Sequence, residues 1–256
     1  MTKTSDEVGE RLTEIDIVCY RWGTLYSVQD VNILRASVAR HLTVPHRFHC
    51  VTDDPAGLHP EIAAHPLPDE GVDGIWRKLG TFRHDFLGLQ GRHVVSLDID
   101  IVIVGNLDFL AERPDIDLWI ARNWARKSGS AKGSGSVYRL KVGSHVQVWE
   151  DFIADPAVAV ETYHGKTRQI GEQNWLQHKV GDFTFLPEGK VVSFKRHCGA
   201  RGRRLLGIDT SRFGVARPPS NAAVVSFHGD PLPRDVMHSR HGRWRRAPFV
   251  AEHWHL

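Results

Sequence analysis

Apolar runs alternating with amphipathic stretches fill the first hundred residues of this 256-residue chain and constrain its fold more than any other feature. Four short apolar runs, each bounded by turn-forming or charged residues, have the length of buried strands: 16–20, 47–52, 62–66 and 93–97. Between them, 28–42 and 76–87 carry apolar residues at helical spacing. Strands and helices in alternation predict an α/β fold with a mostly parallel central sheet flanked by helices.

The second half of the chain shows similar patterns less regularly. Strands are expected at 117–121, 137–142, 183–186, 191–194 and 222–227. Helices are expected at 144–153 and 170–178. Segment 127–136 is rich in Gly and Ser, which favours a mobile loop close to a ligand. No linker divides the chain, so we expect a single domain whose C-terminal part is less regular.

Composition narrows the class of protein. The apolar fraction of 41% and the charged fraction of 25% are those of an ordinary globular protein. No transmembrane span is expected, and residues 1–15 are too polar for a signal peptide, so we expect a disordered lead-in. Cys19 and Cys50 lie inside apolar runs, as buried reduced thiols do, and we interpret Cys198 beside His197 as incidental. These features favour a cytoplasmic protein.

Two Asp-x-Asp triplets occur, and their surroundings differ. Asp98 and Asp100 lie between the apolar runs 94–97 and 101–104, whereas Asp115-Ile116-Asp117 follows Pro114 in a polar stretch. Ligands of doubly wound sheets bind beyond the carboxyl ends of the strands, where Asp98 would lie. Two carboxylates in so apolar a segment repel each other unless a cation joins them, and a hard divalent metal ion is the simplest candidate. The alternative is a pair that caps the next turn and forms salt bridges to Lys78 or Arg92.

Five short motifs occur along the chain, and their order is more specific than any one of them alone. They are Cys50-Val51-Thr52-Asp53-Asp54, Trp76-Arg77-Lys78-Leu79, Ser96-Leu97-Asp98-Ile99-Asp100 with Gly105-Asn106-Leu107-Asp108, Gly171-Glu172-Gln173-Asn174-Trp175-Leu176, and Val225-Ser226-Phe227-His228-Gly229. The series, over 16–233, resembles glycosyltransferases with the glycosyltransferase-A fold. It is most similar to bacterial family 8 enzymes, which include glycogenin and lipopolysaccharide galactosyltransferases. The resemblance implies one domain, with a nucleotide-sugar-binding half at 16–130 and an acceptor and catalytic half at 131–233.

The resemblance also implies roles for single residues. Asp98, Asp100 and His228 would bind Mn²⁺ or Mg²⁺, and a histidine ligand favours manganese. Asp98 and Lys78 would also contact the donor, a nucleotide-sugar such as a UDP-sugar. The donor-binding set of the resemblance comprises Tyr20, Trp22, Gly23, Lys78, Asp98 and Gly229. Within it, the first loop would line the base, with Tyr20 or Trp22 stacked on it.

The catalytic pair implied by the resemblance is Glu172 and Gln173, which would stabilise positive charge at the anomeric carbon. The resemblance implies retention of configuration, with the leaving phosphate accepting the acceptor's proton. An inverting enzyme would instead need a base, for which Glu172 or Asp151 could serve. The acceptor stays open between a saccharide, a lipid-linked molecule and a protein.

Three departures from the family's pattern concern the diphosphate and the acceptor. The late segment continues as Asp230-Pro231-Leu232-Pro233-Arg234 and lacks the family's Lys and Trp, so Arg234 or the cluster 201–204 would have to substitute. Glu172 stands where the family has Asp. The family's Asn-Ser-Gly turn is matched only loosely, by 133–136.

Two rival functions fit parts of the sequence. A nucleotidyltransferase usually has a Gly-rich basic loop after its first strand, and 20–24 holds a single glycine and a single arginine. A nucleic-acid-binding protein would explain the basic C-terminal third, but a net charge of only +3 and eight tryptophans argue against it. The basic tail 234–256 could contact an anionic membrane, although we favour a disordered or packed tail.

Overall fold

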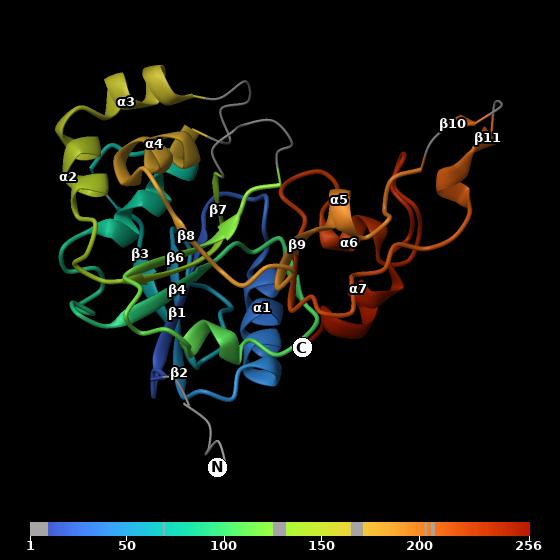
Figure 1. Ribbon diagram of the computed structural model, residues 1–256, viewed down its shortest axis with the longest axis horizontal. Coiled ribbons are helices and arrows are strands. Elements are labelled where there is room, and N and C mark those ends of the chain that lie inside the picture. The colour runs from blue at the N-terminus through green and yellow to red at the C-terminus, as the bar shows by residue number, and fades with distance from the viewer. Residues whose placement is uncertain (1–9, 69, 125–131, 165–170, 203, 206–207) are drawn as a thin grey trace, which may run out of the picture.

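The computed structural model describes residues 10–68, 70–124, 132–164, 171–202, 204–205 and 208–256. A seven-stranded sheet in the order β3-β2-β1-β4-β7-β6-β8 forms its centre (Figure 1). Its strands are β1 (Ile15–Arg21), β2 (His46–Thr52), β3 (Ile62–Pro66), β4 (His93–Leu97), β6 (Leu118–Arg122), β7 (Gly133–Lys141) and β8 (Thr184–Phe185). The strands β3, β2, β1 and β4 run parallel, and β7 is antiparallel to both of its neighbours. The predicted mostly parallel α/β sheet is confirmed.

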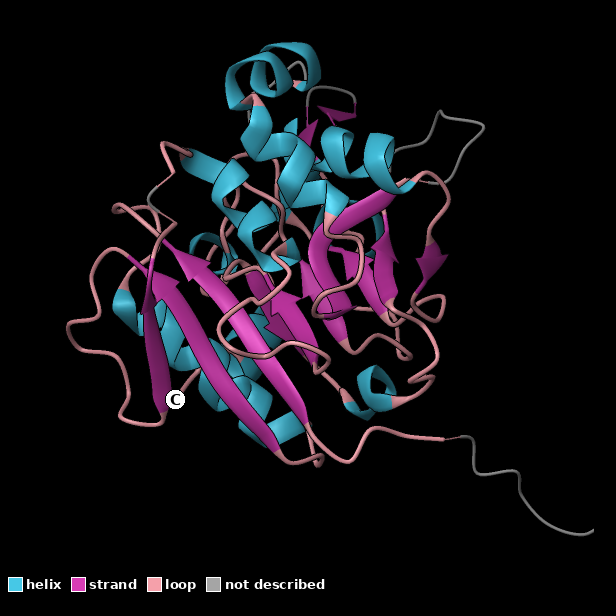
Figure 2. Cartoon of the chain, turned by 90° about the vertical axis from the view of Figure 1, so that its left-hand side faces the viewer, coloured by secondary structure: helices cyan, strands magenta, loops and turns pink. Residues whose placement is uncertain are grey.

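Helices cover both faces of this sheet (Figure 2). Alternate residues of a strand point to opposite faces, so Ile17 of β1 packs with α1 (Val28–His41), while Val18 packs with η1 (Gly74–Phe82) on the other side. The second face also carries α2 (Gln147–Ala154), α3 (Pro156–Tyr163) and α4 (Gly171–Val180). Ser27 is the N-cap of α1 and forms a capping box with Asp30.

The C-terminal third builds a smaller layer beside the main sheet. Its three-stranded sheet has the order β5-β12-β9, from β5 (Ile101–Ile103), β12 (Val224–Ser226) and β9 (Val191–Ser193). Its remaining elements are α5 (Phe194–His197), β10 (Arg204–Leu205), β11 (Ile208–Asp209), η4 (Thr210–Arg212), α6 (Pro233–Val236) and α7 (Pro248–His253). The short η2 (Asp108–Ala111) packs instead in the main core beside α1. Because β5 follows Asp100 directly, this layer joins the main sheet at the carboxylate motif.

The tail 234–256 is packed. Trp244 and Phe249 are buried against Phe194, and Arg40 of α1 donates to the carbonyl oxygens of His253 and His255 at 2.9 Å each. The two aromatic side chains are therefore unavailable to a membrane. No helix in the described residues has the length and apolar character that crossing a membrane requires.

Two expected elements differ from the structure. The stretch 76–87 forms a 3-10 helix that ends at Phe82, and Leu87 and Gly88 then adopt positive φ angles of 56° and 71°. The apolar residues Trp76, Leu79 and Phe82 are three apart, which fits three residues per turn as well as an α-helix. Of the expected loop 127–136, residues 127–131 lie outside the described part, and 133–136 belong to buried β7.

The cysteines match the prediction. Cys19, Cys50 and Cys198 are buried free thiols, and Cys19 lies opposite Cys50 in the β1–β2 pair.

Candidate active site

Asp98 and Asp100 lie in the bend between β4 and β5, directly beyond the expected strand 93–97. The Asp98 amide donates to the carbonyl of Ser136 at 2.9 Å, which ties the bend to β7. Asp98 keeps 28% of its side chain exposed, whereas Asp100 is only 5% exposed. The two carboxylates thus present one accessible and one buried group at the carboxyl end of β4. By contrast, Asp115 of the second triplet is exposed and pairs with Arg113.

Lys78 supplies the counter-charge of this bend. Its Nζ donates to Asp98 Oδ1 at 2.5 Å and to the carbonyl of Gly135 at 2.9 Å. Burial alone would lower the pKa of Lys78, but attraction to Asp98 and Glu172 outweighs it and raises that pKa. The salt bridge to Lys78 that belonged to the alternative interpretation is therefore present, while Arg92 pairs with Asp16 and Glu14 instead.

Glu172 is a second buried carboxyl group near Lys78. It is 4% exposed, and neither carboxylate oxygen has a hydrogen-bond partner. A Cβ placed on Gly135 would lie 3.4 Å from Glu172 Oε1 and 3.8 Å from Lys78 Nζ, so the three groups meet at one point. Burial raises the pKa of Glu172 to about 7, with Lys78 opposing and Asp98 adding to this shift. Gln173 lies alongside, accepting from Asn123 at 3.4 Å.

Asp100 is anchored by the C-terminal layer. Its Oδ2 accepts from the amide of Gly229 at 2.9 Å, and its backbone carbonyl accepts from Phe227 at 3.0 Å. Tyr26, which the sequence reasoning missed, also donates to this carboxylate. Burial and the neighbouring charge of Asp98 raise the pKa of Asp100 to about 6. The site therefore brings Asp98, Asp100 and the His228–Gly229 turn together.

His228 has a positive φ of 42°, and its ring stacks on Trp124 with centroids 5.3 Å apart. Its Nε2 lies 2.6 Å from Ser193 Oγ, and its carbonyl accepts from Lys195 at 3.0 Å. Burial, followed by Lys195 and Arg196, lowers the pKa of His228 to about 4. The imidazole is therefore neutral at physiological pH, the form that binds metals. Ser193, Trp124 and Lys195 were all missed from the sequence.

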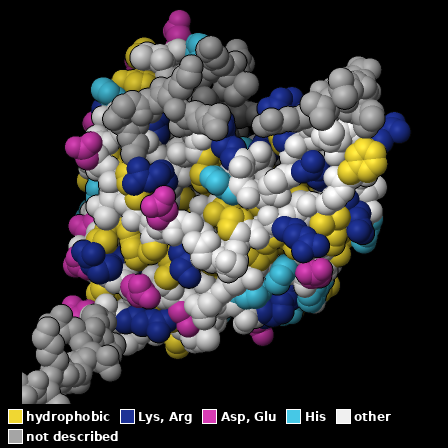
Figure 3. All heavy atoms as spheres, turned by 45° about the vertical axis from the view of Figure 1, so that its right-hand side comes forward, with side chains coloured by type: hydrophobic (Ala, Val, Ile, Leu, Met, Phe, Trp, Pro, Cys, Tyr) yellow, Lys and Arg dark blue, Asp and Glu magenta, His cyan; other side chains and the backbone are white. Residues whose placement is uncertain are grey.

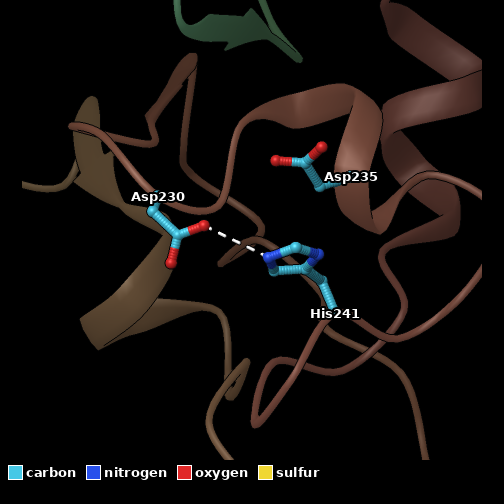
Figure 4. Close-up of side chains that lie close together, drawn as sticks. All are labelled: Asp230, Asp235 and His241. Carbon is cyan, nitrogen blue, oxygen red and sulfur yellow. Dashed lines mark hydrogen bonds and ion pairs between the residues drawn. The ribbon is translucent and has the colours of Figure 1, made fainter.

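A different trio forms the compact group of metal-type ligands in the described residues. Donor atoms of Asp230, Asp235 and His241 lie within 4.8 Å of one another (Figure 4). His241 Nε2 contacts Asp230 Oδ1 at 3.2 Å, while Asp235 Oδ2 accepts from the amide of Leu232 at 2.8 Å and so begins α6. Asp230 is 77% exposed, and an exposed group of this kind commonly has no metal.

The Asp98 bend fits a divalent cation better on chemical grounds. Two carboxylates lie close together there, and the charge of Asp98, added to burial, raises the pKa of Asp100. His228 belongs to the same turn as Gly229, whose amide holds Asp100, but within the described residues the ligand atoms of Asp98, Asp100 and His228 do not lie within 4.8 Å of one another. A cation would relieve the repulsion between the carboxylates, and hydrogen bonding of Nε2 to Ser193 would leave Nδ1 for the ion.

The predicted base-binding loop is only partly supported. Tyr20 is 5% exposed, bonds Thr81 Oγ1 at 2.9 Å and stacks with Phe86, so stacking of Tyr20 on a base is wrong. An aromatic ring at a strand end gains free energy by packing into the core on that face of the sheet. Trp22 is half-buried and keeps part of its ring accessible. The Gly23 amide donates to Asp53 Oδ2 at 2.9 Å, which joins the loops after β1 and β2.

Two further candidates have structural partners. Arg234, expected to bind the diphosphate, donates to Asp30 at 3.1 Å and to the Leu25 carbonyl at 3.0 Å. Asp151, the alternative base, pairs with Lys179 at 2.7 Å and is half exposed.

Comparison with solved structures finds glycosyltransferases. The apo form of GlyE from Streptococcus pneumoniae TIGR4 aligns with a TM-score of 0.58 at 15% identity, over 94% of this chain and 60% of GlyE. The active-site mutant Gln-to-Glu of LgtC aligns with a TM-score of 0.56 at 15% identity, over 85% of this chain and 89% of LgtC. The bifunctional glycosyltransferase WbbM aligns at 0.59 and 10% identity, over 97% of this chain and 50% of WbbM.

This chain thus spans 60% of GlyE and half of WbbM, but most of LgtC. No protein-family model and no curated protein matches the sequence. At these identities the likeness shows the fold: this chain shares the α/β fold of glycosyltransferases such as LgtC, as the order of its motifs predicted.

Proposed function

We propose that this protein is a glycosyltransferase that moves a sugar from a nucleoside-diphosphate donor, a UDP-sugar, to an acceptor. One observation carries the proposal: Asp98, Lys78 and Glu172 meet at the carboxyl end of β4, on the fold of known glycosyltransferases. In open α/β sheets this edge is where ligands bind. One structure of LgtC is a complex with donor and acceptor sugar analogues, which supports a sugar nucleotide as the ligand class.

Asp98, Asp100 and His228 are the residues that would hold Mn²⁺ or Mg²⁺. When bound, the ion would act as a Lewis acid that screens the negative charge of the leaving diphosphate. Lys78 fixes Asp98 in position through its 2.5 Å contact, and the Gly229 amide fixes Asp100. These contacts hold the two carboxylates in a defined geometry before any ligand arrives, which reduces the cost of reorganisation.

Glu172 and Gln173 are the proposed catalytic pair at the anomeric carbon. Sugar transfer develops positive charge on that carbon, and a carboxylate in a buried site stabilises it strongly. The positive charge of neighbouring Lys78 favours the ionised form of Glu172 and so opposes the effect of burial. The Gln-to-Glu change in LgtC lies in its active site, which supports a glutamine beside the reacting centre. Retention of configuration remains our expectation for the stereochemistry.

The proposal is tested by incubating the protein with a panel of nucleotide-sugars, with and without Mn²⁺, and measuring release of the free nucleoside diphosphate. We expect slow, metal-dependent hydrolysis of one UDP-sugar. A parallel incubation with a sugar phosphate and nucleoside triphosphates tests the rival nucleotidyltransferase. Pyrophosphate release there, with no hydrolysis in the panel, would overturn the proposal.

A further inference from the structure

Lys195 lies beside the candidate metal site but comes from a different part of the chain. It follows β9 in the short helix α5, and its Nζ donates to the His228 carbonyl at 3.0 Å. The next amide along, that of Gly229, holds Asp100. Lys195 therefore lies beside the His228–Gly229 turn, within the electrostatic reach of Asp100 and Asp230.

The ammonium group of Lys195 has unused binding capacity. An ammonium group has three N–H donors, and one of them is accounted for by the His228 carbonyl. No carboxylate of the described residues lies within 4.0 Å of its Nζ, since Lys195 forms none of the salt bridges found there. Its side chain is half-buried, so the remaining donors are incompletely hydrated, and burial lowers its pKa. Such a group gains from an anion that it can contact directly.

Three other cations near this edge of the sheet are already engaged. Lys78 is held by Asp98 and Gly135, and Arg234 by Asp30 and Leu25. The guanidinium of Arg21 donates to the carbonyls of Tyr26 and Asp54. Using any of them for a ligand would break an existing contact, whereas Lys195 can keep its bond to His228.

We infer that Lys195 binds the diphosphate of the nucleoside-diphosphate donor. This inference rests on the proposed function and names the residue that supplies positive charge on the His228 side of the site. The chemistry is a charge-assisted hydrogen bond from ammonium to phosphate oxygen, which strengthens as a second negative charge is added. Lys195 is therefore a determinant of diphosphate over monophosphate.

The experiment is calorimetric. Wild-type protein is titrated in Mn²⁺ with UDP, ADP, GDP and CDP, and the diphosphate that binds best is then compared with its monophosphate. Both are titrated into K195M, K195Q and K195R, with thermal unfolding as the check on folding. The matched control is K190M, which alters a lysine just before β9, at the end of that strand away from Lys195.

We expect K195M and K195Q to weaken diphosphate binding about ten- to a hundredfold, because a hydrogen bond to a charged group is lost. Monophosphate binding should weaken much less, K195R should recover most of the affinity, and K190M should match the wild type. Diphosphate affinity in folded K195M or K195Q that equals the wild type would overturn the inference, as would equal loss of mono- and diphosphate. If the wild type itself binds none of the four diphosphates, the proposed function is what fails.

Discussion

Glu172 is the residue whose environment departs most from that of an ordinary surface carboxyl. Its carboxyl is buried without a hydrogen-bond donor, and its pKa is raised from 4.5 to about 7. A raised carboxyl pKa means that the folded protein binds the proton more tightly than the unfolded chain. The stability from this protonation is complete below pH 4.5 and is lost as pH rises through about 7.

We predict that Glu172→Gln removes this pH dependence. Wild-type protein should lose on the order of 3 kcal/mol of unfolding free energy across that window, because each pKa unit corresponds to about 1.4 kcal/mol. The glutamine variant cannot titrate and should show a flatter profile. Urea denaturation at about pH 5 and about pH 8 measures both. Identical profiles in the two proteins would show that Glu172 is not the titrating group.

Other site residues were predictable from sequence to differing degrees. Asp98 and Asp100 stand out because an apolar strand directly precedes them, a local signal that the structure retains. Tyr26 reaches the site from the β1–α1 connection, Ser193 from the end of β9 and Lys195 from α5. Their approach depends on how distant segments pack, and nothing in their own neighbourhood of the sequence indicates it. For Tyr20 the error is the opposite one, because it was predicted to bind the base and lies in the core. An aromatic residue at the end of a strand gives the same sequence pattern whether its ring is buried or exposed.

At the scale of elements, the start of α4 places Glu172. Gly171 opens this helix against Trp76, whose ring stacks on Phe152 with centroids 5.2 Å apart. A Cβ on Gly171 would lie 2.5 Å from Trp76 Cζ2, closer than packing allows. The glycine therefore sets the distance between α4 and η1, and with it the distance between Glu172 and Lys78.

We predict that Gly171→Ala destabilises the fold by about 1–3 kcal/mol, the usual cost of overpacking a rigid contact. Helix propensity alone would predict the opposite sign, because alanine favours helices. Chemical denaturation measures the change, and His178→Ala, at an exposed position of the same helix, serves as the control. A gain in stability would mean that α4 can move away from Trp76 without cost.

Strands were predicted more reliably than the segments between them. The run 93–97 is mostly apolar and carries no Asp, Glu, Lys or Arg because both faces of β4 are buried, and a short run of this kind is typical of a central strand. The beginning of β7 was missed, because Gly133–Ser136 is poor in strand-forming side chains. These residues are held by pairing with β6, where the register shifts between Ile120 and Ala121. Pairing of this kind is a tertiary effect.

At the scale of the whole molecule, charge is strongly segregated. Segments 195–217 and 237–246 hold eleven of the 33 Lys and Arg residues and one of the 30 Asp and Glu residues, which leaves 22 basic against 29 acidic residues elsewhere. The two segments lie side by side, since the Gly202 amide donates to Arg243 and the Arg245 amide to Ala200, both at 2.8 Å. Figure 3 shows basic side chains on the corresponding side of the molecule.

This basic side also exposes an aromatic ring, since Phe213 is 62% exposed. We propose that it contacts anionic membranes, which attract basic residues at low ionic strength. Sedimentation with anionic vesicles should retain wild-type protein, and the R201Q/R212Q/R243Q variant should be released at lower salt. Neutral vesicles should retain neither. Deleting 234–256 is unsuitable as a test because that tail contributes core residues. Equal sedimentation of variant and wild type would end this proposal.

The central claim, a metal-dependent sugar-nucleotide site at Asp98 and Asp100, is tested most directly by calorimetric titration of UDP-sugars with and without Mn²⁺. The proteins are the wild type, Asp98→Asn, Asp100→Asn and the control Asp115→Asn, which alters the exposed second triplet. We predict that wild-type and Asp115→Asn proteins bind only with the metal, and that both site variants lose about tenfold or more in affinity. Equal, metal-free affinity in all four proteins would contradict the claim.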